Sequence, residues 1–174
     1  MAQHPILTNW CPPGSIRAPP SATCTSRSPT SIAPRPSYQG VLGFALTGRL
    51  GDQTAFVAAG DYHHHIGLDR WKSRGGSPPP PGTTGLYHVA IRYPPRAALA
   101  GALRAMIERR YPMCGAADHA VSEAIYLRDF DGNGIEIYWD WPRDAWPVAA
   151  DGGCAMVVEP LDLGDLLAVD EDTS

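Results

Sequence analysis

No apolar stretch in this 174-residue chain approaches the roughly 18–20 residues that a membrane-spanning helix needs. Runs rich in Lys or Arg are also missing, and the formal net charge is only −4, which argues against a nucleic-acid partner held by basic patches. The first ten residues lack the charged and apolar regions of a signal peptide. We therefore expect a cytoplasmic protein that binds neither a membrane nor a nucleic acid.

Paired cysteines are missing as well. The chain has 4 Cys, at positions 11, 24, 114 and 154, and none of them forms a CxxC motif. In a cytosolic protein such isolated thiols are expected to stay reduced. The sequence thus predicts neither a disulfide framework nor a zinc site built from cysteines.

Acidic residues are absent before Asp52, whereas eight of the 18 Pro lie within residues 1–37. Ser and Thr fill much of this segment, and neither a strand period nor a helix period is visible. Such a composition buries too little apolar surface to offset its ordering entropy, so residues 1–37 are predicted to be disordered or loosely attached. A second low-complexity piece, residues 73–84, contains four consecutive prolines and predicts a stiff, extended linker.

The remaining segments read as globular α+β sequence. Alternating residues and turn signals predict strands at 44–47, 54–58 and 63–68 before the linker, and at 85–93, 117–121, 123–128 and 134–139 after it. A helix is predicted to begin after Pro94–Pro95, because proline suits the first helical turn. Its apolar stripe would be Leu99, Leu103, Met106 and Ile107. Residues 85–146 thus read β-α-β-β-β, and the tail, 147–174, holds a short helix near 161–169.

Two side chains on different predicted strands suggest a metal site. His88 shares a strand face with Ala90 and Arg92, and Glu136 stands between two isoleucines that point the other way. A carboxylate in such a place is costly unless it is paired or ligating. Two His and one carboxylate with open positions suit non-haem Fe(II) or Mn(II). The alternative is a Glu136 that faces water or pairs with Arg92.

Other polar residues are candidates for proton transfer or substrate binding. His119 and Tyr126 could hydrogen-bond a substrate or move a proton, or they could be ordinary surface residues. In the run His63–His65, a strand would place the first and third imidazoles on one face, and the alternative is a polar strand end.

Four sequence runs resemble the vicinal oxygen chelate superfamily, which includes glyoxalase I, bleomycin-resistance proteins and extradiol ring-cleaving dioxygenases. They span 38–46 (YQGVLGFAL), 61–71 (DYHHHIGLDRW), 85–91 (GLYHVAI) and 118–140 (DHAVSEAIYLRDFDGNGIEIYWD). The last three are similar to the catechol 2,3-dioxygenase-like branch. The resemblance covers about residues 38–165 and implies paired βαβββ modules, each curling into half of a barrel around a metal.

The resemblance implies roles for individual residues. His88 and Glu136 would be metal ligands, and the metal would be Fe(II), with Mn(II) as the alternative. His65 would mirror Glu136 in module one and, with His119 and Tyr126, would serve catalysis, while His63 and Tyr138 would contact the substrate. The substrate would be a small aromatic or vicinal-dioxygen compound, and relatives of this kind often form homodimers through their paired modules.

The chain departs from the family pattern before Tyr38, where module one should contribute a strand with a further histidine ligand and then a helix. We interpret residues 20–37 as a frameshifted segment. Allowed codons for these residues, read one base out of phase, can encode a strand with His-Val-His-Leu followed by an amphipathic helix, and the lost ligand would fall near Thr23. Residues 38–72 would then be the remnant of a module that lacks its first strand and helix. We expect this loss to weaken metal binding, stability and activity.

Three functional hypotheses follow from the resemblance. The first is a metal-dependent extradiol dioxygenase that cleaves a catecholic ring, impaired in this chain. The second is a glyoxalase-type lyase or isomerase, although such sites usually carry a carboxylate where His65 stands. The third is a bleomycin-resistance-like protein that binds a small molecule without catalysis.

Overall fold

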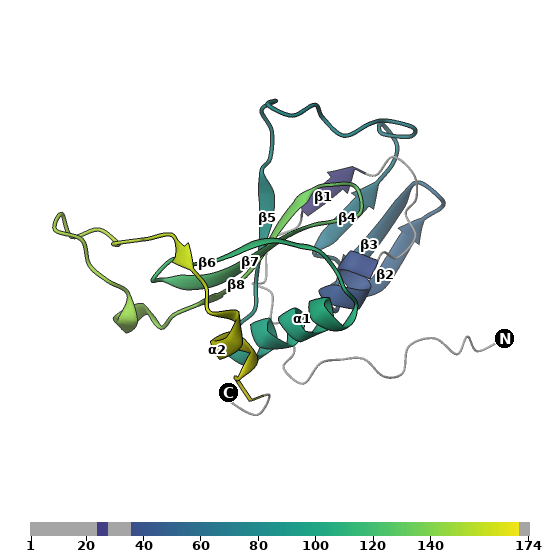
Figure 1. Ribbon diagram of the computed structural model, residues 1–174. Coiled ribbons are helices and arrows are strands. Elements are labelled where there is room, and N and C mark those ends of the chain that lie inside the picture. The colour runs from purple at the N-terminus through teal and green to yellow at the C-terminus, as the bar shows by residue number, and fades with distance from the viewer. Residues whose placement is uncertain (1–23, 28–35, 171–174) are drawn as a thin grey trace.

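The computed structural model describes residues 24–27 and 36–170, which form two β-sheets with helices packed beside them (Figure 1). One sheet has four strands in the order β1-β4-β3-β2, and the other has five in the order β5-β8-β7-β6-β9. The predicted α+β class with paired, strand-rich modules is therefore confirmed. No helix among these residues is both long enough and apolar enough to cross a bilayer.

The second module follows the predicted β-α-β-β-β order. It consists of β5 (His88–Arg92), α1 (Arg96–Glu108), β6 (Met113–Asp118), β7 (Ser122–Arg128) and β8 (Gly134–Asp140). Strand β5 runs parallel to β8, while β6, β7 and β8 are antiparallel neighbours. The sequence placed β6 too late, at 117–121. The chain turns there instead, because Ala120 adopts a φ of 62° and its N–H donates to the Asp118 carboxylate.

The first module contains η1 (Pro36–Val41), β2 (Ala45–Leu50), β3 (Thr54–Ala58) and β4 (Ile66–Asp69). Strand β3 matches its predicted bounds, and β2 begins one residue later than predicted. Strand β4 begins only at Ile66, so the three consecutive histidines precede the strand rather than form part of it. The strands of module one thereby repeat the order of those in module two, with β4 second in its sheet as β8 is in the other.

Strand β1 (Cys24–Arg27) was not expected. Module one was predicted to lack its first strand, yet these four residues pair in parallel with β4, in the place that β5 takes beside β8. Strand pairing depends on backbone groups, so an exposed edge can recruit a segment whose side chains carry no strand pattern. The rest of the predicted disordered segment, and the site of the proposed lost ligand near Thr23, lie outside the described residues.

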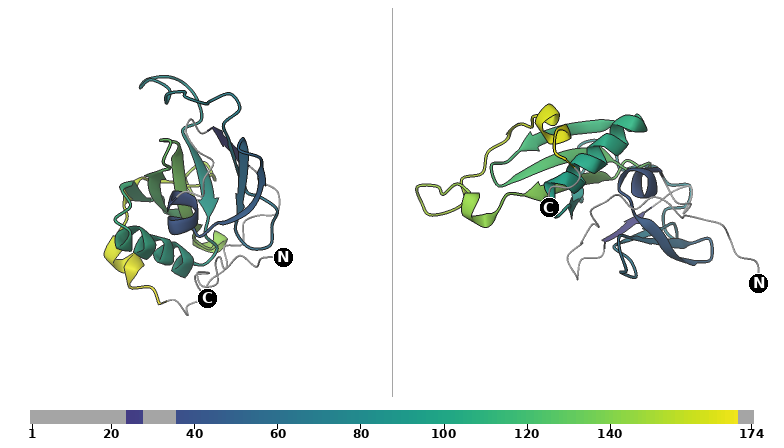
Figure 2. Two further views of the ribbon diagram at one scale, coloured as in Figure 1. Left: turned by 90° about the vertical axis from the view of Figure 1, so that its right-hand side faces the viewer. Right: turned by 90° about the horizontal axis from the view of Figure 1, so that it is seen from below.

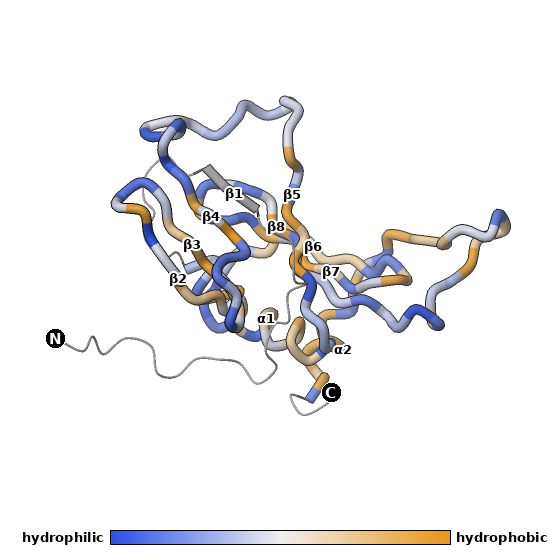
Figure 3. The backbone as a smooth tube through the Cα atoms, turned by 180° about the vertical axis from the view of Figure 1, so that it is seen from behind, coloured by the Kyte–Doolittle hydropathy of each residue, from blue (hydrophilic) through white to orange (hydrophobic). Residues whose placement is uncertain are grey.

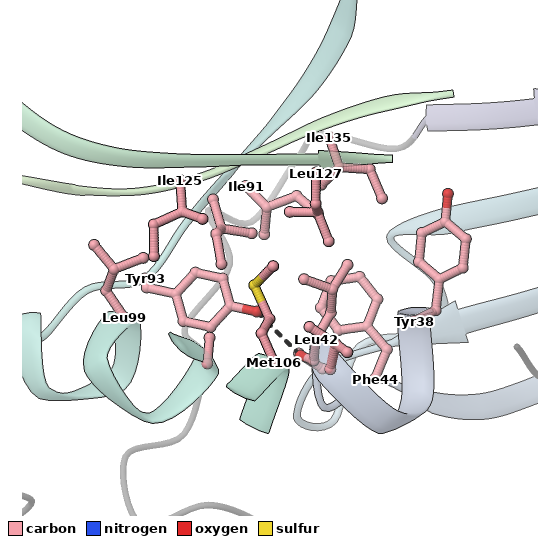
Figure 4. Packing of buried hydrophobic residues seen from close by; sticks show 14 of the residues in the cluster. Tyr38, Leu42, Phe44, Ile91, Tyr93, Leu99, Met106, Ile125, Leu127 and Ile135 are labelled. Atoms are coloured by element: carbon pink, nitrogen blue, oxygen red, sulfur yellow. Dashed lines mark hydrogen bonds between the residues drawn. The ribbon is translucent and has the colours of Figure 1, made fainter. Parts of the chain in front are cut away.

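The apolar core lies between α1 and the inner faces of both modules (Figure 4). Leu99, Leu103 and Met106 are at most 2% exposed, as the helical stripe predicts, but Ile107 is 56% exposed. At 3.6 residues per turn, Ile107 points about 80° away from Leu99, at the margin of the stripe. The hydroxyl of Tyr93 donates to the carbonyl of Leu42 at 3.2 Å, which ties the two modules together inside this core.

The two modules lie side by side, with α1 and α2 on the same side of the second sheet (Figure 2). Coloured by hydropathy, apolar stretches lie along the strands of both sheets (Figure 3). Helix α2 (Leu163–Leu167) lies within the predicted tail helix and buries Leu166 completely. Between β8 and α2 a long arm, residues 141–158, which includes η2 (Arg143–Ala145), extends away from the sheets before β9 (Glu159–Pro160) (Figure 1).

Candidate functional site

Strand alternation presents Glu136 on the face of the second sheet opposite α1. Its neighbours Ile135 and Ile137 are at most 1% exposed and face the core, so the carboxylate points the other way. The ladder registers place Ala90 on one side of Glu136 and Tyr126 on the other. Side chains from β5, β7 and β8 therefore meet around one carboxylate.

His88 contacts Glu136 directly. The Nε2 atom of the imidazole lies 2.8 Å from Oε2 of the carboxylate, and the two side chains are 29% and 14% exposed. The alternative pairing of Glu136 with Arg92 is not present, since Arg92 approaches Asp140 instead, at 3.5 Å. The two residues predicted as metal ligands thus lie in contact, and both side chains are mostly buried.

Gly134 makes this contact geometrically feasible. A Cβ atom at this position would lie 2.2 Å from the Tyr87 carbonyl oxygen and 3.0 Å from Cβ of His88. Only glycine lets β5 approach β8 this closely, and His88 pairs with Gly134 in the ladder. A glycine inside a strand is itself a sequence signal of close backbone approach.

A hydrogen-bonded chain continues from Glu136 through Tyr126 to His119. The Tyr126 hydroxyl lies 3.2 Å from Oε1 of Glu136 and 2.8 Å from Nε2 of His119. On the far side of the imidazole, Nδ1 lies 2.9 Å from the carbonyl oxygen of Val157. Four side chains, from His88 to His119, therefore form one continuous polar line.

The proton inventory of this line is limited. The Val157 carbonyl can only accept, so Nδ1 of His119 carries a proton and donates it. Tyr126 has one proton, which it can donate to Glu136 or to a neutral His119. In the structure the hydroxyl donates to Oε1 of Glu136, while Nε2 of His119 lies within hydrogen-bond distance of the Tyr126 hydroxyl oxygen.

Tyr126 remains a phenol under ordinary conditions. Burial raises the pKa of its hydroxyl to about 12, and the nearby Glu136 carboxylate adds to the rise. Tyr126 therefore donates a hydrogen bond or relays a proton, and it does not supply a phenolate.

The three consecutive histidines form a separate group in module one. His65 is only 8% exposed, and its Nδ1 accepts the Ala59 N–H at 3.2 Å, while its ring lies 4.8 Å from that of Tyr62. The Nδ1 atoms of His63 and His64 are 2.6 Å apart. Burial lowers the pKa of His65, and the neighbouring histidines lower it further. None of these imidazoles contacts His88 or Glu136 among the described side chains.

Tyr138 is the remaining candidate for substrate contact. It follows Glu136 on β8 and shares its face, two residues further along the strand. It pairs in the ladder with Ala124 on β7 and with Arg92 on β5. Burial and Asp140 raise the pKa of its hydroxyl.

The donor set of His88 and Glu136 suits a divalent cation. Cis ligands at about 2.1 Å from a metal ion lie roughly 3 Å apart, which is close to the observed contact. The support for this pair is incomplete, because Nδ1 of His88 is buried without a hydrogen-bond partner, whereas ligating histidines normally donate from their second nitrogen. Within 24–27 and 36–170, no group of three His, Cys, Asp or Glu side chains gathers around one point. The pair fits a metal as two ligands of a larger set.

A buried ion pair holds the other face of β7. Glu123 is 3% exposed and accepts two hydrogen bonds from Arg96, at 2.7 and 2.8 Å. Arg96 also reaches Asp165 of α2 at 2.7 Å. This bridge fixes the start of β7 against both helices. An isolated Glu in an apolar strand gave no hint of a partner 27 residues away in the sequence.

Comparison with known proteins supports one superfamily. No family model matches the chain. A catechol-2,3-dioxygenase of Bacillus subtilis is 49% identical over 84 residues, which are 48% of this chain but 29% of that protein, so less than a third of the relative is represented. A glyoxalase/dioxygenase from Nostoc punctiforme has the same fold, with a TM-score of 0.54 and 20% identity over 79% of this chain and 100% of its own.

A second solved structure has a similar fold. Lactoylglutathione lyase from Agrobacterium tumefaciens superposes with a TM-score of 0.52 at 19% identity, covering 70% of this chain and 94% of that chain. The paired modules, the sequence match and these shared folds agree with one another. Together they show the fold shared by glyoxalases and related dioxygenases, and they support a place for this chain in the vicinal oxygen chelate superfamily.

Proposed function

We propose that this chain carries the site of a metal-dependent extradiol dioxygenase, which cleaves a catecholic ring. The observation that carries the proposal is the continuous line His88–Glu136–Tyr126–His119, with contacts of 2.8, 3.2 and 2.8 Å on one face of the second sheet. The sequence match to a catechol-2,3-dioxygenase supports the same activity.

The chemistry divides between a cation and the side chains. A bound Fe(II) would act as Lewis acid and template for the two oxygens of a catechol and for O2. His88 and Glu136 would hold the cation and leave positions open for the substrate. In the overall reaction a ring carbon–carbon bond next to one hydroxyl breaks and both oxygen atoms of O2 enter the product, so no further reductant is required.

Tyr126 and His119 would manage protons and orientation. A catechol that chelates a cation must release a hydroxyl proton, and His119 can accept a proton through Tyr126 while Val157 holds its ring in place. The phenol of Tyr126 can also donate a hydrogen bond to a catecholate oxygen, since its pKa of about 12 keeps it protonated. His65 stays proposed for catalysis, and His63 and Tyr138 stay proposed for substrate contact.

A non-catalytic binding protein is the second candidate. It is favoured by the two-ligand character of the site among the described residues and by the buried Nδ1 of His88, which lacks a partner. A glyoxalase-type activity has support from the shared fold with lactoylglutathione lyase. That fold likeness alone does not select a reaction.

The test begins with the metal content of the purified full chain, followed by O2 uptake with catechol after addition of Fe(II). We expect Fe(II)-dependent O2 uptake, lost in His88→Ala and Glu136→Gln and reduced in Tyr126→Phe. His64→Ala, a half-buried histidine of module one with no assigned role, serves as a control for non-specific metal binding. Catechol binding without O2 uptake in the Fe(II)-loaded chain would favour the binding protein, and turnover of a hemithioacetal without O2 would favour the glyoxalase type.

A further inference from the structure

The face that carries His88 and Glu136 also carries an arginine, further along the same strand. Arg92 is four residues beyond His88 on β5, so the two side chains leave the same face with Cα atoms about 13 Å apart. Ala90, which is exposed, is the residue between them on this face. A methyl side chain leaves the surface between the imidazole and the guanidinium open.

Arg92 is oriented by one ion pair, but not all of its hydrogen-bond donors are used. Its Nε atom lies 3.5 Å from Oδ2 of Asp140, and the two side chains are 49% and 31% exposed. Such a loose, exposed ion pair contributes little to stability by itself. Asp140 therefore orients the guanidinium but leaves its terminal N–H groups able to bind another anion. The described residues offer no hydrogen-bond acceptor to the two terminal amino groups of Arg92.

The other arginine on this face is engaged. Arg128 of β7 lies at the opposite end, and its Nη1 donates to the Gly132 carbonyl at 2.7 Å. It is thereby committed to the β7–β8 turn. Arg92 is the guanidinium on this face whose paired N–H groups remain available for an anion.

We propose that Arg92 determines specificity by binding a carboxylate substituent of the substrate, so that the site prefers catechols that carry an acidic group. This inference rests on the proposed function, because it assumes that the two catechol oxygens bind at the His88–Glu136 end. A substituent on the far side of the ring then extends along β5, past Ala90, toward Arg92. The planar guanidinium matches a carboxylate with two parallel hydrogen bonds, which a neutral substituent cannot form.

Isothermal titration of the full chain with Mn(II) in excess under nitrogen tests this preference. The probes are 3,4-dihydroxybenzoate, which carries the carboxylate, and 4-methylcatechol, which is neutral. We expect the acidic probe to bind at least about tenfold more tightly. Arg92→Gln removes this difference without changing the affinity for 4-methylcatechol, and Arg92→Lys restores only part of it.

Two further variants sharpen the result. Asp140→Asn removes the competing carboxylate and should increase the preference for the acidic probe. Arg49→Gln, an exposed arginine on β2 in the other sheet, should leave both affinities unchanged. Equal binding of both probes, or an equal loss of both in Arg92→Gln, would overturn the inference alone. Failure of both probes to bind the metal-supplied chain would overturn the proposed function and this inference with it.

Discussion

Replacing Gly134 with alanine should separate the two ligand strands. The new Cβ would lie 2.2 Å from the Tyr87 carbonyl oxygen, a distance that real Cβ atoms essentially never show. The obstructing atom belongs to the backbone, so no side-chain rotation relieves the clash. Strand β5 must therefore move away from β8 by most of an ångström, and His88, the ladder partner of Gly134, moves with it.

The displacement has two separable costs. Forcing a methyl group into a closely packed backbone contact typically costs about 1–3 kcal/mol of unfolding free energy. Metal sites tolerate only about 0.2 Å in ligand distance, so the shift of His88 should also weaken metal binding by roughly 10–100-fold, the effect of disturbing a ligand's support.

Urea denaturation and titration with Mn(II) measure the two effects. Gly101→Ala is the matched control, because it adds the same methyl group inside α1 where nothing lies within 4 Å. That control should raise stability by about 0.5–1 kcal/mol, as alanine favours a helix interior over glycine. A Gly134→Ala chain as stable as the parent, with unchanged Mn(II) affinity, would refute the close-approach reasoning.

Three other predictions concern the core, the buried ion pair and one histidine. Leu99→Ala, at a fully buried position of α1, should cost about 2–5 kcal/mol in urea denaturation. Glu123→Gln leaves Arg96 with Asp165 as its charged partner and should cost about 2–3 kcal/mol by the same assay, whereas equal stability would show that the bridge is dispensable. The pKa of His65 is lowered in the folded chain, so the unfolded chain binds a proton first and stability should fall as the pH drops below about 6.5. Thermal unfolding between pH 7.5 and 5.5 should show this fall, and His65→Gln should reduce it.

Much of the second module was predictable because its sequence signals are strong and local. The proline pair before α1, the apolar stripe of the helix and the alternation around Glu136 each reflect one short-range rule. The position of β6 was predicted wrongly because the chain turns at Ala120. That turn depends on a left-handed backbone conformation and on a hydrogen bond to the Asp118 side chain, neither of which follows from the residue pattern.

The site was predictable only as a list of residue types. Strand alternation alone puts His88 and Glu136 on defined faces, but their adjacency depends on the parallel register of β5 with β8. Two contacts of the second module escaped prediction for different reasons. Val157 acts through a backbone carbonyl, which has no sequence signature, and Glu123 acts through an ion pair distant in sequence. Strand β1 escaped because it forms by edge pairing rather than by its own pattern.

The hydrogen bond between His119 and the Val157 carbonyl constrains the length and path of the arm. Since the acceptor is a main-chain oxygen, any residue type other than proline can supply it at position 157, but only if the arm keeps its length and path. Proline is the exception because the Val157 N–H also donates to the His119 carbonyl at 3.3 Å. A saturation scan should thus find this position tolerant of every residue but proline, while single-residue insertions or deletions between 147 and 156 should misalign the imidazole. Natural sequence variation in the arm would then preserve the number of residues more strictly than their side-chain types.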